Sequence, residues 1–242
     1  MFTDPAMAQI LPTTFYYFIG SLGLEFLVGL GVALLVYSYT GRLRGVVRTL
    51  ILLPLAMSPV VVALMWMLMF DLNYGPINYF LGLLGVPAQN WLGNTSLSLP
   101  SLIITNAWEF SPFIFLVVYA GLQMIPVELH EAANVDGLGR FQTFRYVTLP
   151  SIRASIVVAL TLDAIGVLKG FDLVYVLTNG GPGYSTSVLS FYIYEVGFSF
   201  LQAHYAAALS LLYLAIIIAF VAAVIKFTSL EDYLGLKKMV EK

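Results

Sequence analysis

The chain has 242 residues, of which 60% are hydrophobic and 10% are charged. Soluble domains carry about 25% charged residues, so this composition excludes an ordinary soluble domain and indicates a polytopic membrane protein. The net charge of −2 provides no basic surface for nucleic acid, and the absence of cysteine excludes disulfides, thiolate metal sites and a cysteine nucleophile.

Five apolar stretches are long enough to cross a bilayer, because a membrane-spanning helix needs about 20 mainly apolar residues. We expect an all-α bundle in a single domain over residues 1–242, with kinks at the prolines inside the spans. The predicted spans lie at about residues 14–38, 46–70, 99–124, 152–177 and 203–227.

The basic residues predict the orientation of these spans. Ten of the eleven Lys and Arg residues lie on one side of the membrane, in or next to the connections after the first and third spans or in the C-terminal region, and Lys169, further inside the fourth span, is the exception. Because basic residues concentrate on the cytoplasmic side, we expect the N-terminus outside and the C-terminus inside. Connections 71–98 and 178–202 contain no Lys or Arg and are predicted to lie outside.

The predicted cytoplasmic connection at residues 126–150 has the pattern of two short helices. Pro126 suits a first helical turn, and Gly137 can end a helix with positive φ. Leu149-Pro150 leads into the fourth span. Small residues such as Ala132 and Ala133 allow another backbone to approach closely. On these grounds the connection is either a docking element for a cytoplasmic protein or a loop packed on its own bundle.

The sequence EAANVDG at residues 131–137, followed by VTLP at 147–150, resembles the EAA loop of ABC importer permease subunits. The glycine stands four residues after the second alanine, and Val147 replaces the usual isoleucine. Residues 120–133 and 171–198 resemble the carbohydrate-type branch, which includes maltose and glycerol-phosphate permeases. The resemblance covers nearly the whole chain and implies the type I importer permease fold.

The resemblance implies that the cytoplasmic helices couple the permease to a separate ATPase. The implied coupling residues are Glu131, Ala132, Ala133, Asp136, Gly137, Arg140, Leu149 and Pro150. For Arg140, an alternative interpretation is a basic anchor at the cytoplasmic face. The glycine-rich sequence at 180–186 lacks the lysine of a phosphate-binding loop. ATP and Mg²⁺ are therefore expected on the partner ATPase, and this chain is expected to hold no cofactor or metal and to have no enzymatic activity of its own.

The implied partners are a second permease subunit forming a heterodimer, an ABC ATPase dimer, an extracytoplasmic solute-binding protein and the lipid of a bacterial or archaeal cytoplasmic (inner) membrane. The family core has six spans and this chain shows five, with its first helix matching the second of the family. A truncated chain, a misassigned start and a reduced bundle all fit this difference.

Ionisable groups inside a bilayer are costly and usually face a cavity or a partner. This rule selects polar residues in the third and fourth spans, and helical spacing adds residues on the same faces. The helices that flank the EAA loop line the substrate path in the family. The predicted path comprises Asn106, Glu109, Phe110, Phe113, Asp163, Val167, Lys169 and Gly170. Structural roles, contacts with the second permease, and a Lys169 that reaches the interface are the alternatives.

The segment after the fourth span is predicted to form the outer gate and the surface for the binding protein. Its residues are Phe171, Asp172, Tyr175, Thr178, Gly180, Gly181 and Pro182. A purely structural turn explains this glycine-rich stretch equally well.

The leading functional hypothesis is the permease of an ABC importer for a sugar or polyol. The low number of cations in the spans favours a neutral sugar over a glycerol-phosphate-type substrate. A different class, an ion-coupled secondary transporter, would use Asp163 or Glu109 as its ion site. An intramembrane enzyme is disfavoured because no paired nucleophile and base stands out.

Overall fold

The protein is described by a computed structural model that covers residues 5–39 and 41–228. This part of the chain is helical and contains no strand, which confirms the all-α prediction. The basic residues Lys237, Lys238 and Lys242, which contributed to the predicted orientation, lie outside the described residues.

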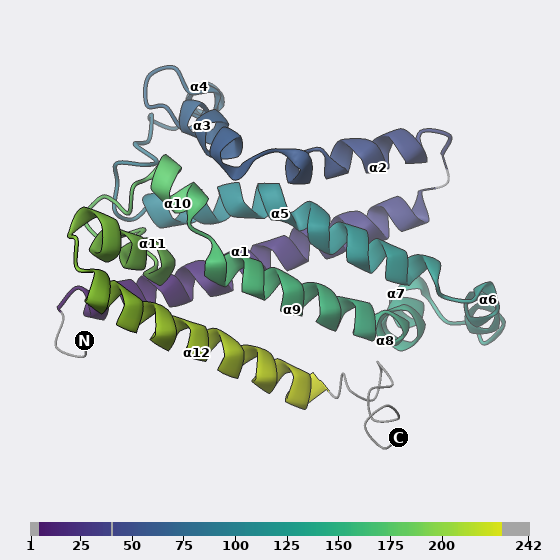
Figure 1. Cartoon of the computed structure of the whole chain (residues 1–242). Helices are drawn as coiled ribbons and strands as arrows, with labels where there is room; N and C mark the ends of the chain where they lie inside the picture. Colours follow the sequence, from purple (N-terminus) through teal and green to yellow (C-terminus); the bar gives the residue numbers. More distant parts are fainter. Residues whose placement is uncertain (1–4, 40, 229–242) are drawn as a thin grey trace, which may run out of the picture.

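Four long helices run side by side and form the body of the molecule (Figure 1). They are α1 (Met7–Ser38), α5 (Ser98–Gln123), α9 (Arg153–Lys169) and α12 (Ala203–Thr228). α1 and α5 pack closely because Gly29 has no side chain. A Cβ at Gly29 would lie 2.6 Å from Cβ of Ile114 and 2.7 Å from the carbonyl oxygen of Ser111.

Three of the described helices are long and apolar enough to cross a membrane: α1, α5 and, over Ala203–Val224, α12. A fourth crossing results if residues Arg140–Ser151 and α9 count as one span, which is bent by 64°. These helices agree in position with four of the five predicted spans, although α1 begins at Met7, earlier than expected.

The second predicted span, residues 46–70, is not one continuous helix. It is divided into α2 (Arg44–Leu52), the short 3₁₀ helix η1 (Pro54–Ala56) and α3 (Pro59–Met69). Proline lacks a backbone N–H and its ring clashes with the preceding turn. It also favours an extended conformation in the residue before it, and Ser58 is extended with ψ of 137°. The two prolines therefore divide this span.

The fourth predicted span, residues 152–177, also ends early. α9 stops at Lys169, and a separate helix, α10 (Asp172–Leu177), packs against α3. Gly170 leaves the helical conformation with ψ of 119°. Carbonyl groups at a helix end need other donors. Ser190 Oγ donates to the Gly170 carbonyl at 2.6 Å, and Tyr213 Oη donates to the Leu168 carbonyl at 2.5 Å.

Short helices occupy the two ends of the bundle (Figure 1). At one end, α6 (Val127–Val135) is followed by α7 (Arg140–Thr143), the π-helical turn η2 (Phe144–Thr148) and α8 (Leu149–Ser151). At the other end lie α4 (Pro76–Leu83), α11 (Leu189–Tyr194) and the π-helical turn η3 (Glu195–Ser199). The molecule therefore presents two different sets of transverse helices to its two sides.

Candidate functional site: a central polar cluster and a transverse helix pair

A cluster of four polar side chains joins α1, α5 and α9 in the middle of the bundle. Tyr17 Oη donates to Asn106 Oδ1 at 3.0 Å, and Asn106 Nδ2 donates to the carboxylate of Glu25. The carboxyl group of Glu25 also contacts that of Asp163. All four residues are at most 5% exposed. The cluster thus consists of hydrogen-bonding groups that the protein shields from lipid.

A small cavity of about 60 Å³ lies beside this cluster. Its lining includes the predicted path residues Asn106, Phe110, Asp163, Val167 and Gly170, and also Tyr17, Pro59, Gly166, Phe171, Asp172 and Leu173. The structure therefore brings together five of the eight predicted path residues, from two helices that are far apart in the sequence.

Glu109, Phe113 and Lys169 do not line this cavity. Glu109 is 1% exposed, and its Oε2 has no hydrogen-bond partner among the described residues. Phe113 packs in the apolar cluster around Ile114. These three side chains therefore lie away from the small cavity, and their place on the substrate path stays a prediction.

Lys169 borders a larger groove of about 720 Å³ between α9, α11 and α12. The groove walls are mainly apolar, with small residues such as Ala206 and Ala207 on α12 and aromatic rings such as Tyr194 and Phe198 opposite them. Lys169 itself is exposed. It is separated by six positions from Asp163, and the two side chains line different hollows.

Sequence reasoning missed Tyr17 and Glu25. The signal for Glu25 was available, because a carboxyl group in the first apolar stretch meets the same criterion that selected Asp163 and Glu109. Tyr17 carried no such signal. A tyrosine in an apolar helix is common, and its partner Asn106 lies 89 positions away in the chain.

The predicted two-helix connection is present at the opposite end from α4. α6 and α7 are joined through Gly137, which has φ of +73°, and the Leu138 N–H donates to the Ala133 carbonyl at 3.0 Å. Such a left-handed glycine is typical after a helix C-terminus. Both α6 and the segment from α7 to α8 run across the long axis of the bundle (Figure 1).

Most of the predicted coupling residues lie on the surface of this helix pair. Exposed positions are Glu131, Ala132, Asp136, Gly137, Arg140 and Pro150. Leu149 is half-buried. Ala133 is 3% exposed and packs inside the chain, so it supports the element and does not present a contact surface. Arg140 borders a cavity of about 280 Å³ between the end of α1 and η2.

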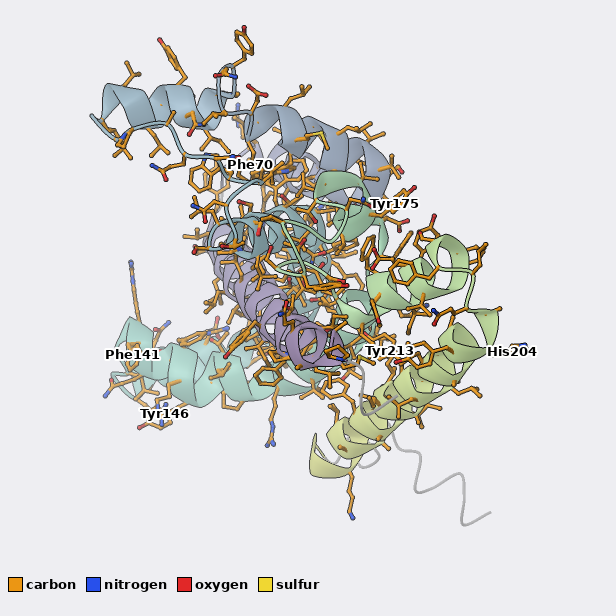
Figure 2. All side chains as sticks on the ribbon, turned by 90° about the vertical axis from the view of Figure 1, so that its left-hand side faces the viewer. Phe70, Phe141, Tyr146, Tyr175, His204 and Tyr213 are labelled. Carbon is orange, nitrogen blue, oxygen red and sulfur yellow. The ribbon has the colours of Figure 1, made fainter. Side chains whose placement is uncertain are left out.

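The same helix pair exposes large apolar side chains. Val135, Phe141 and Tyr146 are 87%, 75% and 65% exposed, and Phe141 and Tyr146 project away from the bundle (Figure 2). Exposed apolar groups rimmed by polar residues are typical of protein-binding surfaces. The sequence prediction of the coupling face did not include these three residues.

The predicted outer gate is a tightly hydrogen-bonded turn. Thr186 Oγ1 donates to Thr178 Oγ1 at 2.7 Å and lies 2.8 Å from the Gly181 carbonyl oxygen. Gly180 has φ of +77°, and a Cβ there would lie 2.5 Å from the ring of Phe191. Nearby, the rings of Phe171 and Tyr175 stack at 5.3 Å. These contacts account for the glycines structurally and leave a gating role as a prediction.

The fold and the transverse helix pair define a class of membrane transport subunit. Residues 25–237 match the family model described as "binding-protein-dependent transport system inner membrane component". The chain belongs to this family, which confirms the resemblance to ABC importer permeases.

Curated relatives in this family are named for sugar transport. The chain is 41% identical over 180 residues to the trehalose/maltose transport system permease protein MalF of Thermococcus litoralis, covering 73% of this chain and 61% of that protein. It is 33% identical over 232 residues to the sulfoquinovosyl glycerol transport system permease protein SmoG of Agrobacterium fabrum, covering 96% of this chain and 75% of that protein.

Solved structures of permeases share the fold. A bacterial ABC transporter involved in the import of the acidic polysaccharide alginate matches with a TM-score of 0.84 and 25% identity, covering 94% of this chain and 80% of the matched chain. The MetNI methionine ABC transporter matches with a TM-score of 0.66 and 18% identity over 94% of this chain and 98% of that chain. The second likeness shows the fold alone.

Proposed function

We propose that this chain is a membrane-spanning subunit of an ATP-driven importer for a sugar delivered by an extracytoplasmic binding protein. It would lie in a bacterial or archaeal cytoplasmic membrane, beside a second permease subunit and above an ABC ATPase dimer. ATP and Mg²⁺ would bind to the ATPase. The chain itself would contribute a passage for the substrate and a surface that responds to the ATPase.

The transverse pair of α6 and α7 is the observation that carries this proposal. Glu131, Asp136 and Gly137 are exposed on it, and Val135 and Phe141 add an apolar surface that solvent alone would not favour. A helix pair that protrudes at one end of the bundle and lies across its axis can seat in a groove of a partner protein. In that position, movement of the ATPase would be transmitted to α5 and α9.

A sugar is supported as the substrate by the relatives and by the chemistry of the central cavity. Asn106, Asp163 and Tyr17 offer donors and acceptors for hydroxyl groups, and Phe110 and Phe171 offer aromatic faces. The cavity volume of about 60 Å³ is below the roughly 300 Å³ or more of typical ligand pockets. The substrate site would therefore form together with the second permease subunit or in another conformation of this chain.

The test is sugar uptake by vesicles that contain the assembled transporter, with Glu131→Lys and Glu131→Gln compared in the same assay. Reversal of an exposed charge on α6 is expected to abolish co-purification of the ATPase and ATP-dependent uptake. The neutral variant is expected to keep most of both, because it has nearly the same size and no opposite charge.

Normal assembly and uptake by the Glu131→Lys variant would contradict the coupling role of α6. Uptake that is driven by an ion gradient, without ATP or the ATPase, would contradict the importer proposal as a whole and favour a secondary transporter. Uptake of amino acids but of no sugar would leave the importer class in place and remove the proposed substrate.

A further inference from the structure

The helix α4 (Pro76–Leu83) has an apolar exposed surface that the proposed transport function does not use. It contains 8 residues, far fewer than the roughly 20 that are needed to cross a bilayer. Residues 72–108 include no Asp, Glu, Lys or Arg. Soluble domains carry about 25% charged residues. The composition of this segment is therefore not that of a surface exposed to bulk water.

The exposed side of α4 is aromatic and aliphatic. Tyr79, Phe80 and Leu83 are 66%, 63% and 68% exposed, and their spacing places them on neighbouring positions of one helical face. The rings of Tyr79 and Phe80 meet edge to face at 5.6 Å. Leu84, at the end of the helix, is 80% exposed. We call Tyr79, Phe80, Leu83 and Leu84 the outer face of α4.

The opposite side of α4 is held in place by Asn78, which is 7% exposed. Its Nδ2 lies 2.9–3.3 Å from the carbonyl oxygens of Asp71, Leu72 and Gln89, and its two hydrogens are shared among these three acceptors. Its Oδ1 accepts from the Gln89 N–H and from Trp91 Nε1, both at 3.0 Å. Five contacts on one side chain fix the helix relative to the loops on both sides of it. The outer face is therefore presented in a defined direction.

The turn before α4 is fixed as well. The backbone N–H groups of Tyr74 and Asn73 donate to the Asp71 carboxylate at 2.8 and 2.9 Å, and these bonds lower the pKa of that carboxyl group. A Cβ at Gly75 would lie 2.4 Å from the Asp71 carbonyl oxygen, so only glycine fits this close turn. α4 is thus a rigid extension of the bundle, and its exposure does not result from a loosely attached loop.

The orientation of α4 is parallel to the expected membrane plane. Figure 2 looks along the bundle axis, and there α4, in pale blue, extends sideways from the neighbourhood of Phe70. Trp91, which bonds to Asn78, lies 5.7 Å from the ring of Phe70, which in turn lies 5.1 Å from that of Trp66. Such Trp-rich clusters are enriched at the membrane–water interface, and they place α4 at that depth.

The preceding helix, α3, also exposes apolar side chains. Val61, Leu64 and Leu68 of that helix are 51%, 50% and 72% exposed. We propose that α4 is an interfacial helix whose outer face inserts into the headgroup–acyl boundary of the leaflet opposite the coupling helices. Short helices with one apolar face bind the bilayer surface in this way. The helix would thereby anchor the outer end of α3 and α10 at a constant depth.

The absence of cysteine from the native chain allows a direct test by site-directed spin labelling. Tyr79→Cys and Leu83→Cys place labels on the outer face of α4. Thr95→Cys, in the exposed polar loop before α5, serves as the control. Each labelled chain is assembled into the full transporter in vesicles of phosphatidylethanolamine and phosphatidylglycerol. The accessibility of the label to oxygen and to a water-soluble nickel chelate is then measured by electron paramagnetic resonance.

We expect the ratio of oxygen to nickel accessibility to be several-fold higher at positions 79 and 83 than at position 95, because oxygen concentrates in lipid. Equal ratios at all three positions would show that water covers the outer face and would overturn the proposal. Low accessibility to both reagents at 79 and 83 would show that another protein covers the face, which would overturn it equally.

Discussion

At the level of single residues, the central cluster depends on hydrogen bonds between side chains of three different helices. Asn106 donates to Glu25 and accepts from Tyr17, while Glu25 Oε2 and Asp163 Oδ2 receive no donor group from the described residues. Buried polar groups are costly when their partners are removed. The cluster therefore combines a structural role in joining α1, α5 and α9 with free acceptor capacity beside the small cavity.

Glu25→Gln is expected to preserve or raise stability, and Glu25→Leu is expected to lower it. Glutamine can still accept from Asn106 and adds a donor for the Asp163 carboxylate. Leucine leaves the Asn106 amide without an acceptor, which costs about 1–3 kcal/mol. The midpoint of denaturant unfolding in detergent measures both effects. If glutamine destabilised the protein as much as leucine does, the negative charge of Glu25, and not its hydrogen bond, would hold the cluster together.

Gly166 offers a test of the substrate path that leaves the hydrogen bonds intact. It lines the small cavity, and a Cβ there would meet no atom within 4 Å. Gly166→Val is expected to keep the fold, because glycine is the poorer helix former by up to about 1 kcal/mol, and to reduce sugar uptake by narrowing the path. Gly31→Val in α1, where a Cβ is equally free, is the control. Unchanged sugar uptake by the Gly166→Val variant would show that this cavity is not part of the substrate path.

At the element scale, the contact between α1 and α5 depends on one glycine. Gly29→Val is expected to destabilise the protein by about 1–3 kcal/mol, which is the typical cost of overpacking. The new side chain would press on Ile114 and on the backbone at Ser111. Gly31→Val, two residues further along the same helix and without neighbours within 4 Å, is expected to have little effect. The difference between the unfolding midpoints of the two variants measures how much the close packing of α1 on α5 contributes to stability. Equal midpoints would contradict the dependence of this contact on Gly29.

Substitutions at two glycines with nearly the same backbone conformation can distinguish an effect on ATPase docking from an effect of local backbone strain. Gly137 between α6 and α7 has φ of +73°, and Gly85 after α4 has φ of +78°. A Cβ meets no atom of the chain within 4 Å at either position, and asparagine tolerates this conformation better than most residues. Gly137→Asn is expected to weaken co-purification of the ATPase, because it adds bulk to the coupling surface, whereas Gly85→Asn is not. A similar loss in both variants would indicate strain alone.

At the scale of the whole molecule, the bundle separates a coupling end from an interfacial end. α6 to α8 carry the exposed apolar residues of the proposed docking surface, and α4 lies at the other end (Figure 1). The central cluster lies between them on α1, α5 and α9, and α5 and α9 are the helices that flank the coupling element. A displacement of α6 and α7 would thus act first on the two helices that line the small cavity.

The purified chain is expected to hydrolyse no ATP by itself, and the assembled transporter is expected to do so. The phosphate-binding loop of an ATPase requires a lysine before its Ser or Thr, which the glycine-rich segment at 180–186 lacks. Phosphate release is measured for the purified chain and for the complex at equal concentrations. Hydrolysis by the chain alone, purified free of the ATPase, would contradict the proposed division of labour.

Several features could be predicted from local sequence. Apolar runs of sufficient length indicated four of the long helical segments. The turn at Gly137 followed from a glycine after a helical stretch. The shared cavity of Asn106 and Asp163 followed from the rule that intramembrane polar groups face a cavity. The same reasoning treated residues 46–70 and 152–177 as single helices, because hydropathy measures composition and does not show where the backbone turns.

Local sequence was enough to predict the features that depend on near neighbours along the chain: the apolar segments, the two short helices around Gly137 and the membership of the permease family. The packing of the helices determined which polar groups meet, because Glu25 and Asn106 are 81 positions apart. It also decided the end of α9 at Gly170 and the sideways direction of α4, since both depend on hydrogen bonds from residues 11 or more positions away. Contacts of this kind come from packing between helices, and the order of residues within one helix does not encode them.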